Sequence, residues 1–436
     1  MDMPVPSTPL SATLSAPLSD GEADALIGAM GAHARAAATV LAAAPTTHKA
    51  EALRHAARLL RERADAVLAA NAEDLTRADA AGMAAAMKDR LTLTPARLEG
   101  VAEALEAVAG LDDPVGQLID QRTRPNGLDL RRVRVPLGVV GIIYESRPNV
   151  TADAGALALM AGNAAILRGG SEARASNAAI HAALADGIEA AGLPRDAVQL
   201  IPTPDRAAVG ALLRAQGLVD IIVPRGGKGL VARVQAEARV PVLAHLDGIN
   251  HSFVHASADR AMAEAIVVNA KLRRTGVCGA TETLLIDRGY AHAPALVAAL
   301  LDAGCALRGD GHAQALDPRI TPASDEDWDT EYLDAICSVG LVDGVEGAVA
   351  HIAAHASHHT DAIIAGDADA AEHFLNAVDS AIVMWNASTQ FADGGEFGLG
   401  AEIGISTGRL HARGPVALEG LTTYKWQVRG QGQTRP

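Results

Sequence analysis

The feature that most constrains the fold is a regular alternation of short apolar segments and longer amphipathic segments between residues 139 and 240. The apolar runs are VVGII, AAILRG, VQLIP and VDIIVP, and stretches such as SEARASNAAIHAALADGIEAAG separate them. Apolar residues spaced by three and four indicate helices, whereas short continuous apolar runs indicate strands. Short strands joined by helices predict a parallel sheet that binds ligands at the carboxyl ends of its strands.

The rest of the chain extends this α/β pattern. Helical spacing predicts a helical lead-in from about residue 20 to 110. The turn Pro125-Asn126-Gly127 separates two extended segments and predicts a β-hairpin that leads into the first apolar strand. A second alternating block covers about 241–407, and a polar, extended tail follows. The first twenty residues, rich in Pro, Ser, Thr and Ala, predict a flexible tail.

Composition excludes two classes of partner. The chain has 436 residues, and 37 Lys and Arg against 52 Asp and Glu give a net charge of -15, which repels nucleic acid and anionic membranes. No apolar run is long enough to span a membrane, and the N-terminus lacks the positive charge of a signal peptide. The three cysteines show no CxxC spacing. We therefore expect a soluble, cytoplasmic protein that binds neither nucleic acid nor membranes.

Two glycine-rich loops follow predicted strands. Gly226 and Gly227 lie between a strand and a helix, where backbone N–H groups and the helix dipole favour a phosphate. The loop is not a Walker loop, because Ile222 stands where the first Gly is required. By itself it is equally compatible with a tight strand-to-helix connection. The second loop, from Arg168 to Ser171, favours a dinucleotide, because two such loops then lie on one sheet.

Cys278 differs from the other two cysteines in its surroundings. It lies in KLRRTGVCGATETLLI, between two glycines and after three cations. Glycines allow a loop to approach a substrate closely, and nearby cations favour the thiolate. Cys305 and Cys337 stand among apolar residues, which predicts that they are buried. Cys278 does not fit that pattern, so a reactive thiol is open for it, although a lone cysteine is more often structural.

The basic run before Cys278 contains Lys271, Arg273 and Arg274. Two interpretations are comparable: these side chains guide a phosphate, or they are solvated loop charges. The sequence does not separate them.

A histidine cluster occurs in HIAAHASHHTD, which contains His351, His355, His358, His359 and Asp361. Histidines at i and i+4 share a helix face and can bind a metal, but there is no HExxH pattern. We favour a cluster that serves hydrogen bonding or substrate contact.

Together these stretches resemble the γ-glutamyl phosphate reductase family, a branch of the aldehyde dehydrogenase superfamily. The most specific motifs are VPLGVVGIIYESRPNVT, HLDGINH, SHHTDAI, FGLGAEIGIST and LHARGPVALEGLTTYKW. The resemblance covers nearly the whole chain after the first twenty residues. It implies a Rossmann-type nucleotide-binding domain at 21–245, a catalytic domain at 246–408, and a small oligomerisation element. That element combines a hairpin at about 118–136 with the tail at 409–436.

The resemblance also implies roles for individual residues. Cys278 falls on the nucleophile, and Asn149, in ESRPNVT, falls on the asparagine whose amide assists the oxyanion hole. The predicted cofactor-binding residues are Arg168, Gly169, Ser171, Gly226, Gly227 and Glu331. The predicted substrate contacts are Arg147, His359, Thr360 and Asp361. No metal is expected.

Two positions depart from related patterns. His245 stands where hydrolytic aldehyde dehydrogenases carry a glutamate that activates water. A reductase must avoid hydrolysis of its acyl intermediate, so the absence of this base suits the reductive direction. Asn250 replaces a cysteine typical of the reductase branch, so the sequence assigns its side chain no role.

The implied activity is the NADPH-dependent reduction of L-glutamyl 5-phosphate to L-glutamate 5-semialdehyde through a cysteine thioester. This is the second step of proline biosynthesis, and a homo-oligomer, either a dimer or a tetramer, is implied. Arg168 and Ser171 can pair with a 2′-phosphate, although Arg168 is equally at home as a surface charge. The alternatives are a coenzyme A-dependent acylating dehydrogenase, a metal-dependent hydrolase built on the histidine cluster, and a non-catalytic nucleotide-binding protein.

Overall fold

A computed structural model describes residues 17–435, apart from the side chain of residue 86. The chain forms two compact units. The first contains the chain up to Val242 and the segment from Leu421 onward, and the second runs from Leu243 to Gly420. The boundary after Val242 lies close to the one expected after residue 245. The C-terminal segment joins the first unit at Leu421, well beyond residue 409, where the tail was expected to begin. Most of the predicted flexible tail, up to residue 16, lies outside the described residues.

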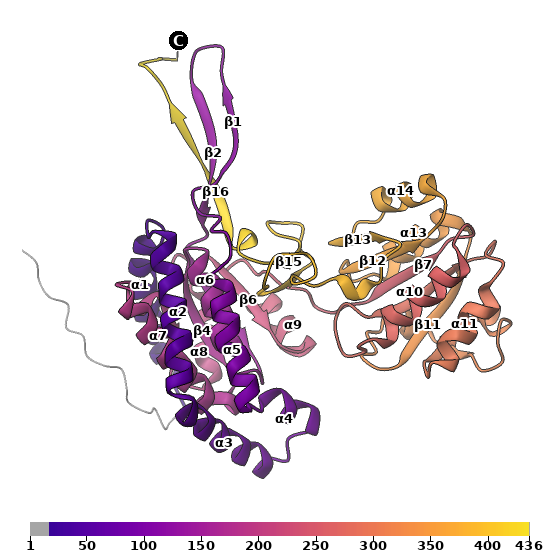
Figure 1. Ribbon diagram of the computed structural model, residues 1–436, viewed down its shortest axis with the longest axis horizontal. Helices are drawn as coiled ribbons and strands as arrows, with labels where there is room; N and C mark the ends of the chain where they lie inside the picture. Colours follow the sequence, from indigo (N-terminus) through magenta and orange to yellow (C-terminus); the bar gives the residue numbers. More distant parts are fainter. Residues whose placement is uncertain (1–16, 436) are drawn as a thin grey trace, which may run out of the picture. The chain divides into compact units, whose positions relative to one another are not determined.

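The first unit is built around a four-stranded parallel sheet (Figure 1). In the spatial order β5-β4-β3-β6, its strands are β5 (Val198–Leu200), β4 (Ala164–Gly169), β3 (Val139–Tyr144) and β6 (Ile221–Arg225). Every residue of β3 is buried, as is typical of a central strand in a parallel sheet. The parallel sheet predicted from the strand–helix alternation is therefore confirmed.

Nine α-helices and two short 3-10 helices belong to the described part of this unit. The helices are α1 (Asp20–Leu41), α2 (Thr46–Glu62), α3 (Ala64–Ala80), α4 (Ala85–Leu91), α5 (Pro95–Val108), α6 (Val150–Met160), α7 (Arg174–Ala190), α8 (Arg206–Arg214), α9 (Lys228–Glu237), η1 (Ser171–Ala173) and η2 (Arg195–Ala197). A capping box between Ser19 and Glu22 starts α1 at Asp20, inside the predicted tail. Helices α1 to α5 confirm the predicted helical lead-in.

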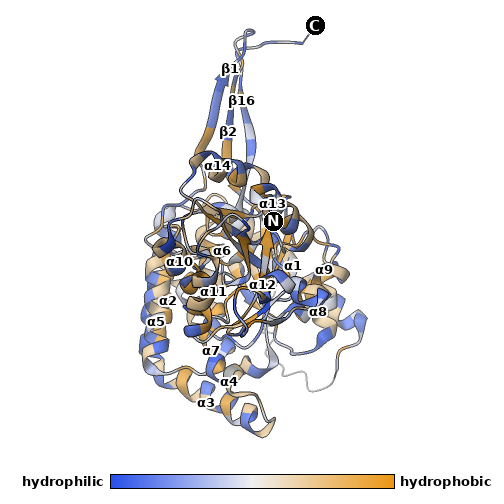
Figure 2. Ribbon diagram, turned by 90° about the vertical axis from the view of Figure 1, so that its right-hand side faces the viewer, coloured by the Kyte–Doolittle hydropathy of each residue, from blue (hydrophilic) through white to orange (hydrophobic). Residues whose placement is uncertain are grey.

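A separate three-stranded antiparallel sheet joins the hairpin to the C-terminal segment. It contains β1 (Leu118–Thr123), β2 (Asp129–Pro136) and β16 (Thr422–Arg429), with β2 in the middle. Figure 2 shows that hydrophobic and hydrophilic residues both occur along these strands. Arg132 lies over the rings of Tyr424 and Trp426, at 5.2 Å and 5.6 Å from their centroids. The predicted hairpin and its pairing with the C-terminal tail are both confirmed.

The second unit contains a seven-stranded parallel sheet in the order β10-β9-β11-β8-β7-β12-β13. Its strands are β7 (Asn250–Val254), β8 (Thr281–Asp287), β9 (Ala306–Gly309), β10 (Thr321–Pro322), β11 (Ile336–Val342), β12 (Thr360–Ile364) and β13 (Ile382–Trp385). Its α-helices are α10 (Arg260–Leu272), α11 (Ala293–Asp302), α12 (Gly311–Gln314), α13 (Gly344–His355) and α14 (Ala368–Ala377). The shorter elements are η3 (Asp325–Asp329), η4 (Thr389–Phe391), the hairpin strands β14 (Gly404–Ser406) and β15 (Gly414–Val416), and η5 (Glu419–Leu421) at the boundary.

Helices cover both faces of this sheet. Along β8, Leu284 and Ile286 belong to a core cluster with residues of α10 and α11, whereas Leu285 packs with residues of α13 and α14. Cys305 and Cys337 are buried in the first of these clusters, which confirms the sequence prediction, and burial raises the pKa of Cys305 to about 11. None of the helices between residues 17 and 435 is both long and apolar enough to cross a membrane.

Candidate active site

Cys278 lies on the loop between α10 and β8, and its side chain is partly exposed. The residues around this loop come from the amino ends of three neighbouring parallel strands, β8, β7 and β12. The strand register places Asn250 beside Thr281, and His251 beside Asp361. Three segments that are far apart in the sequence therefore meet at one edge of the sheet.

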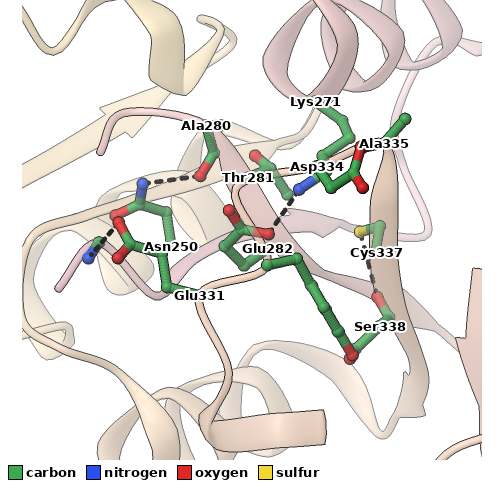
Figure 3. Close-up of polar contacts among 12 residues, drawn as sticks. Asn250, Lys271, Ala280, Thr281, Glu282, Glu331, Asp334, Ala335, Cys337 and Ser338 are labelled. Carbon is green, nitrogen blue, oxygen red and sulfur yellow. Dashed lines mark hydrogen bonds and ion pairs between the residues drawn. The ribbon is translucent and has the colours of Figure 1, made fainter. Parts of the chain in front are cut away.

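The amide of Asn250 fixes the backbone of the cysteine loop. Its Nδ2 donates to the carbonyl oxygens of Cys278, at 2.6 Å, and Ala280, at 2.8 Å (Figure 3 shows the second bond). Its Oδ1 accepts a hydrogen bond from the backbone N–H of Thr360 at 3.1 Å. Both amide hydrogens and the carbonyl are used, so Asn250 ties the loop to β12.

Gly248 leaves room for the cysteine backbone. A Cβ atom at this position would lie 2.2 Å from the carbonyl oxygen of Cys278, so no larger residue fits without displacing the loop. The N–H of Gly248 donates to Oε1 of Glu331 at 3.0 Å. Glu331, a predicted cofactor contact, is thereby joined to the segment that packs against Cys278, and its role with the cofactor stays a prediction.

Two histidines lie beside the thiol. A ring nitrogen of His245, a ring nitrogen of His359 and the Sγ of Cys278 all lie within 4.8 Å of one another. The rings of His245 and His359 meet edge to face, with their centroids 5.0 Å apart. His359 precedes β12 and is fully buried. The structure therefore places this predicted substrate contact next to the predicted nucleophile.

Hydrogen bonds determine which nitrogen each of these rings presents. Nδ1 of His245 lies 2.9 Å from the carbonyl oxygen of Ile405, which can only accept, so Nδ1 carries the hydrogen. Nδ1 of His359 lies 2.8 Å from Oγ1 of Thr360, and its Nε2 is buried without a hydrogen-bond partner. Burial and the neighbouring His245 lower the pKa of His359 to about 3, so this ring is neutral at pH 7.

Thr360 and Asp361, also predicted substrate contacts, are fully buried at the start of β12. Asp361 Oδ1 accepts from the backbone N–H of His251 at 2.9 Å and contacts the ring Nδ1 of the same residue at 2.8 Å. The hydroxyl of Ser380 donates to its other oxygen. These bonds hold β7, β12 and the segment before β13 together, and a contact with substrate stays a prediction for both residues.

The other histidines of the predicted cluster make contacts of their own. His351 and His355 are neighbours on α13, with ring centroids 4.6 Å apart, and His355 pairs with Asp329 at 2.8 Å. Nδ1 of His358 contacts the carbonyl oxygen of Asp379. Among residues 17–435, the group whose ligand atoms gather is the one around Cys278, not this cluster.

A buried ion pair joins the two ends of the cysteine loop. Lys271, near the end of α10, and Glu282, in β8, are fully buried and meet at 2.5 Å (Figure 3). Burial raises the pKa of Glu282 to about 7, against the lowering effect of Lys271. The interpretation of Lys271 as a solvated charge or a phosphate guide is wrong, because tertiary packing buries it, whereas Arg273 and Arg274 are exposed.

The remaining candidate residues lie at the carboxyl ends of β3, β4 and β6 in the first unit. Arg168 ends β4 with Gly169 and donates from Nη2 to the carbonyl oxygen of Pro204 at 2.8 Å. Its Nε is buried without a hydrogen-bond partner, and burial lowers the pKa of its guanidinium. Gly169 packs against Asn177, which leaves no space for a side chain, and Ser171 opens η1 directly after the strand.

Gly226 and Gly227 connect β6 to the N-terminus of α9, as predicted. The N–H of Gly227 donates to the Glu145 carboxylate at 3.3 Å, so an anionic group already lies at this helix N-terminus. A Cβ atom on Gly226 would lie 2.5 Å from Oε2 of Glu145. The two glycine loops flank the end of β3, because Gly169 and Arg225 are both paired with Tyr144.

Asn149 follows β3 and caps α6. Its Nδ2 donates to Asp153 at 2.8 Å, and burial raises the pKa of Asp153 to about 6 although this hydrogen bond opposes the shift. Arg147 is exposed in the preceding turn, where Ser146 has a φ of 49°. Asn149 and Cys278 belong to different units, and their predicted roles stay predictions.

Comparison with known proteins identifies the family. Residues 8–328 match the family model of the aldehyde dehydrogenase family. The chain belongs to this family. A γ-glutamyl phosphate reductase from Rhizorhabdus wittichii is 72% identical over 415 residues, which cover 95% of this chain and 97% of that protein. One from Novosphingobium aromaticivorans is 66% identical over 424 residues, which cover 97% and 100%. The crystal structure of γ-glutamyl phosphate reductase from Thermotoga maritima matches with a TM-score of 0.92 and 41% identity, over 94% of this chain and 100% of that one.

In this aldehyde dehydrogenase, three contacts around the predicted nucleophile are not predicted by the sequence. They are the Asn250 amide bonds, the close approach of Gly248 and the Lys271–Glu282 pair. The available signals were the HLDGINH motif, which holds both Gly248 and Asn250, and a charged residue on each side of Cys278. Neither pattern indicates which residue each side chain contacts, because each contact joins segments that come together only in the folded sheet.

Proposed function

We infer that this aldehyde dehydrogenase reduces L-glutamyl 5-phosphate to L-glutamate 5-semialdehyde and phosphate, in proline biosynthesis. The observation that carries this conclusion is the 72% identity to a γ-glutamyl phosphate reductase over nearly the full length of both proteins. The partly exposed thiol of Cys278, on a loop that Asn250 and Gly248 hold in place, is the kind of nucleophile that acyl transfer from a phosphate requires.

In the proposed first step, the Cys278 thiolate attacks the γ-carbonyl carbon and phosphate leaves, so that a glutamyl thioester forms. The Asn149 amide and the backbone N–H of Cys278 stabilise the oxyanion of the tetrahedral intermediate. The hydrogen bond between Asn149 and Asp153 keeps the amide in one orientation. Phosphate is a good leaving group, so little acid assistance is needed.

The first unit fits a nicotinamide cofactor, which family membership implies. The N–H of Gly227 already points at an anion, the Glu145 carboxylate, and Arg168 holds a buried Nε–H without a partner. We assign Gly226 and Gly227 to the diphosphate, Arg168, Gly169 and Ser171 to the adenosine ribose, and Glu331 to the nicotinamide ribose. A bound nicotinamide supplies the hydride that reduces the thioester. NADPH is the proposed form, because Arg168 and Ser171 suit a 2′-phosphate.

The thioester must survive until it is reduced. We propose that His245 protects it by replacing the glutamate that would activate water. Among the predicted substrate contacts, His359 has a ring nitrogen within 4.8 Å of the Cys278 thiol, whereas Thr360 and Asp361 would act through the position of β12. Arg147, exposed after β3, is proposed to bind a substrate carboxylate.

Homo-oligomerisation, as a dimer or tetramer, is proposed for the antiparallel sheet. Large apolar side chains are exposed on it; they are Leu118, Ile119, Tyr424, Trp426 and Val428. Light scattering coupled to size-exclusion chromatography tests this, because Trp426→Ser should lower the measured mass and Trp385→Ser, outside the sheet, should not. None of the three cysteines, all within residues 17–435, forms a disulfide, which supports a cytoplasmic location.

The function is tested in the reverse direction, which avoids the unstable acyl phosphate. Formation of reduced cofactor from glutamate 5-semialdehyde is followed with and without phosphate, with NADP and NAD in parallel, for the wild type and Cys278→Ala. Cys305→Ala is the matched control, because that thiol is buried in the core.

We expect activity that requires phosphate and falls by at least about 1000-fold in Cys278→Ala, as for loss of a nucleophile. Cys305→Ala should stay within a few-fold of the wild type. Activity that requires coenzyme A instead of phosphate would show an acylating dehydrogenase, and activity that persists in Cys278→Ala would refute the proposed nucleophile.

A further inference from the structure

We propose that Cys278, His245 and His359 form a binding site for a soft divalent transition metal, with Zn²⁺ as the reference ion, and that metal binding blocks the nucleophile. The group was not singled out in the sequence, where these residues are separated by more than thirty positions. This inference concerns reversible inhibition and needs no metal in the reductase reaction itself.

The donor set is the first support. One thiolate and two imidazoles are typical zinc ligands, and three protein ligands leave a fourth position for water. The three ligand atoms lie within 4.8 Å of one another. In a tetrahedral site with Zn–S of about 2.3 Å and Zn–N of about 2.0 Å, ligand atoms lie roughly 3.3–3.7 Å apart, so a closure of about 1 Å completes the site.

The second support is the orientation of the two rings. Metal-bound histidines usually donate their other ring N–H to an oxygen atom, which fixes the tautomer. His245 does this through Nδ1 to the Ile405 carbonyl at 2.9 Å, so Nε2 is its coordinating nitrogen. Nδ1 of His359 contacts Thr360 Oγ1 at 2.8 Å, which leaves Nε2 as the other ring nitrogen. Each ring therefore already uses its Nδ1 in a hydrogen bond.

The third support is the state of His359. Its Nε2 is fully buried and has no hydrogen-bond partner, a costly arrangement that a ligand would relieve. On coordination the thiol is deprotonated: the sulfur–metal bond forms as the S–H bond breaks, and one proton passes to solvent.

The other cysteines and the α13 histidines are poorer metal ligands. Cys305 and Cys337 are buried in the core, away from solvent. His351 and His355 lie together, but His355 is paired with Asp329 and no third ligand joins them among the described residues. One metal ion per chain is therefore the expected stoichiometry.

The test measures binding of zinc ion, added as its chloride, to the full chain without substrate or cofactor. Equilibrium dialysis with a non-thiol reductant gives the stoichiometry and Kd. The variants are Cys278→Ser, His359→Asn and His245→Asn, since asparagine can keep the Nδ1 hydrogen bond while it removes Nε2. The matched control is His358→Asn, which changes the adjacent, exposed histidine at φ 60°, a conformation that asparagine tolerates. Circular dichroism confirms the fold of each variant.

We expect one Zn²⁺ per wild-type chain and protection of Cys278 from alkylation. Each of the three ligand variants should raise Kd by at least about 10- to 100-fold, and His358→Asn should leave it unchanged. Cobalt(II) should show a thiolate charge-transfer band in the wild type that Cys278→Ser removes. Wild-type binding that is absent, or that is unchanged in Cys278→Ser or in both histidine variants, would overturn the proposal. Zinc binding is measured without substrate or turnover. A negative result in the reductase assay would therefore not affect the interpretation of the binding data.

Discussion

The two units place their candidate residues at opposite ends of their parallel strands. In the first unit, the glycine loops and Asn149 follow the carboxyl ends of β3, β4 and β6. In the second, the residues around Cys278 precede or begin β7, β8 and β12. The carboxyl ends lead into helices whose N-termini attract anions, which suits a phosphate-bearing cofactor. The amino ends bring side chains and loop backbone together instead.

The two sites also differ in how firmly they are held. Around Cys278, side chains bond to the loop backbone and a buried ion pair joins its two ends. At Gly227, the backbone N–H of an exposed residue donates to the Glu145 carboxylate, at 3.3 Å. A nucleophile must be positioned before reaction, whereas a cofactor must enter and leave. We therefore expect substitutions around Cys278 to lower stability or kcat more than substitutions in the glycine loops.

The largest expected effect comes from Lys271→Met, which leaves the Glu282 carboxylate buried without its partner. Removing one member of a buried pair typically costs about 3–5 kcal/mol in the free energy of unfolding. Urea unfolding followed by fluorescence measures it, and Arg273→Met is the control because Arg273 is exposed. Equal stability of the two variants would show that the pair does not hold the loop.

Gly248→Ala tests whether the close approach of Gly248 holds the cysteine loop in place. The added methyl group would meet the Cys278 carbonyl at 2.2 Å and displace the nucleophile, so we expect kcat to fall by about 100-fold. Gly276→Ala, on the same loop with open space around it, should change kcat by less than about threefold. Similar rates for both variants would mean that the loop moves freely.

Asp153→Asn tests the first unit by its pH dependence. The pKa of Asp153 is raised from 3.8 to about 6, so the folded state holds the proton more tightly than the unfolded state. The wild type should therefore lose stability as pH rises from about 4 to 6, on the order of 1 kcal/mol after allowance for partial exposure. The asparagine variant should lack this loss, which urea unfolding at pH 4, 5, 6 and 7 would reveal. A difference between the proteins that stays constant with pH would contradict the shift.

The smallest effect is expected for Gly227→Ala. No atom lies within 4 Å of the added methyl group, so stability should change by less than about 1 kcal/mol. If the loop binds the diphosphate, KM for NADPH should still rise by roughly threefold or more, because the methyl group hinders close approach. Gly229→Ala, also without neighbours, is the control. An unchanged KM would remove this loop from the cofactor site.

Local sequence patterns predict the helices and strands, whereas contacts between residues far apart in the sequence are not predicted. Pro125-Asn126-Gly127 predicted its hairpin because a two-strand turn is encoded locally, and the apolar run at Val139 predicted β3. The sequence does not predict the burial of Lys271, because its neighbours Arg273 and Arg274 indicate a solvated loop and its partner Glu282 lies eleven residues further on, in β8. Asn250 contacts Cys278 across 28 residues, and only the order of β8, β7 and β12 reveals it.

The role of Cys278 as the acyl-carrying nucleophile is tested most directly by detection of the thioester on its sulfur. The wild type is mixed with glutamate 5-semialdehyde and NADP without phosphate, quenched rapidly, and its peptides are analysed by mass spectrometry. We predict a glutamyl adduct on Cys278 that accumulates without phosphate and disappears when phosphate is added. An adduct that decays equally fast in water alone, or no adduct on Cys278 while the cofactor is reduced, would contradict it.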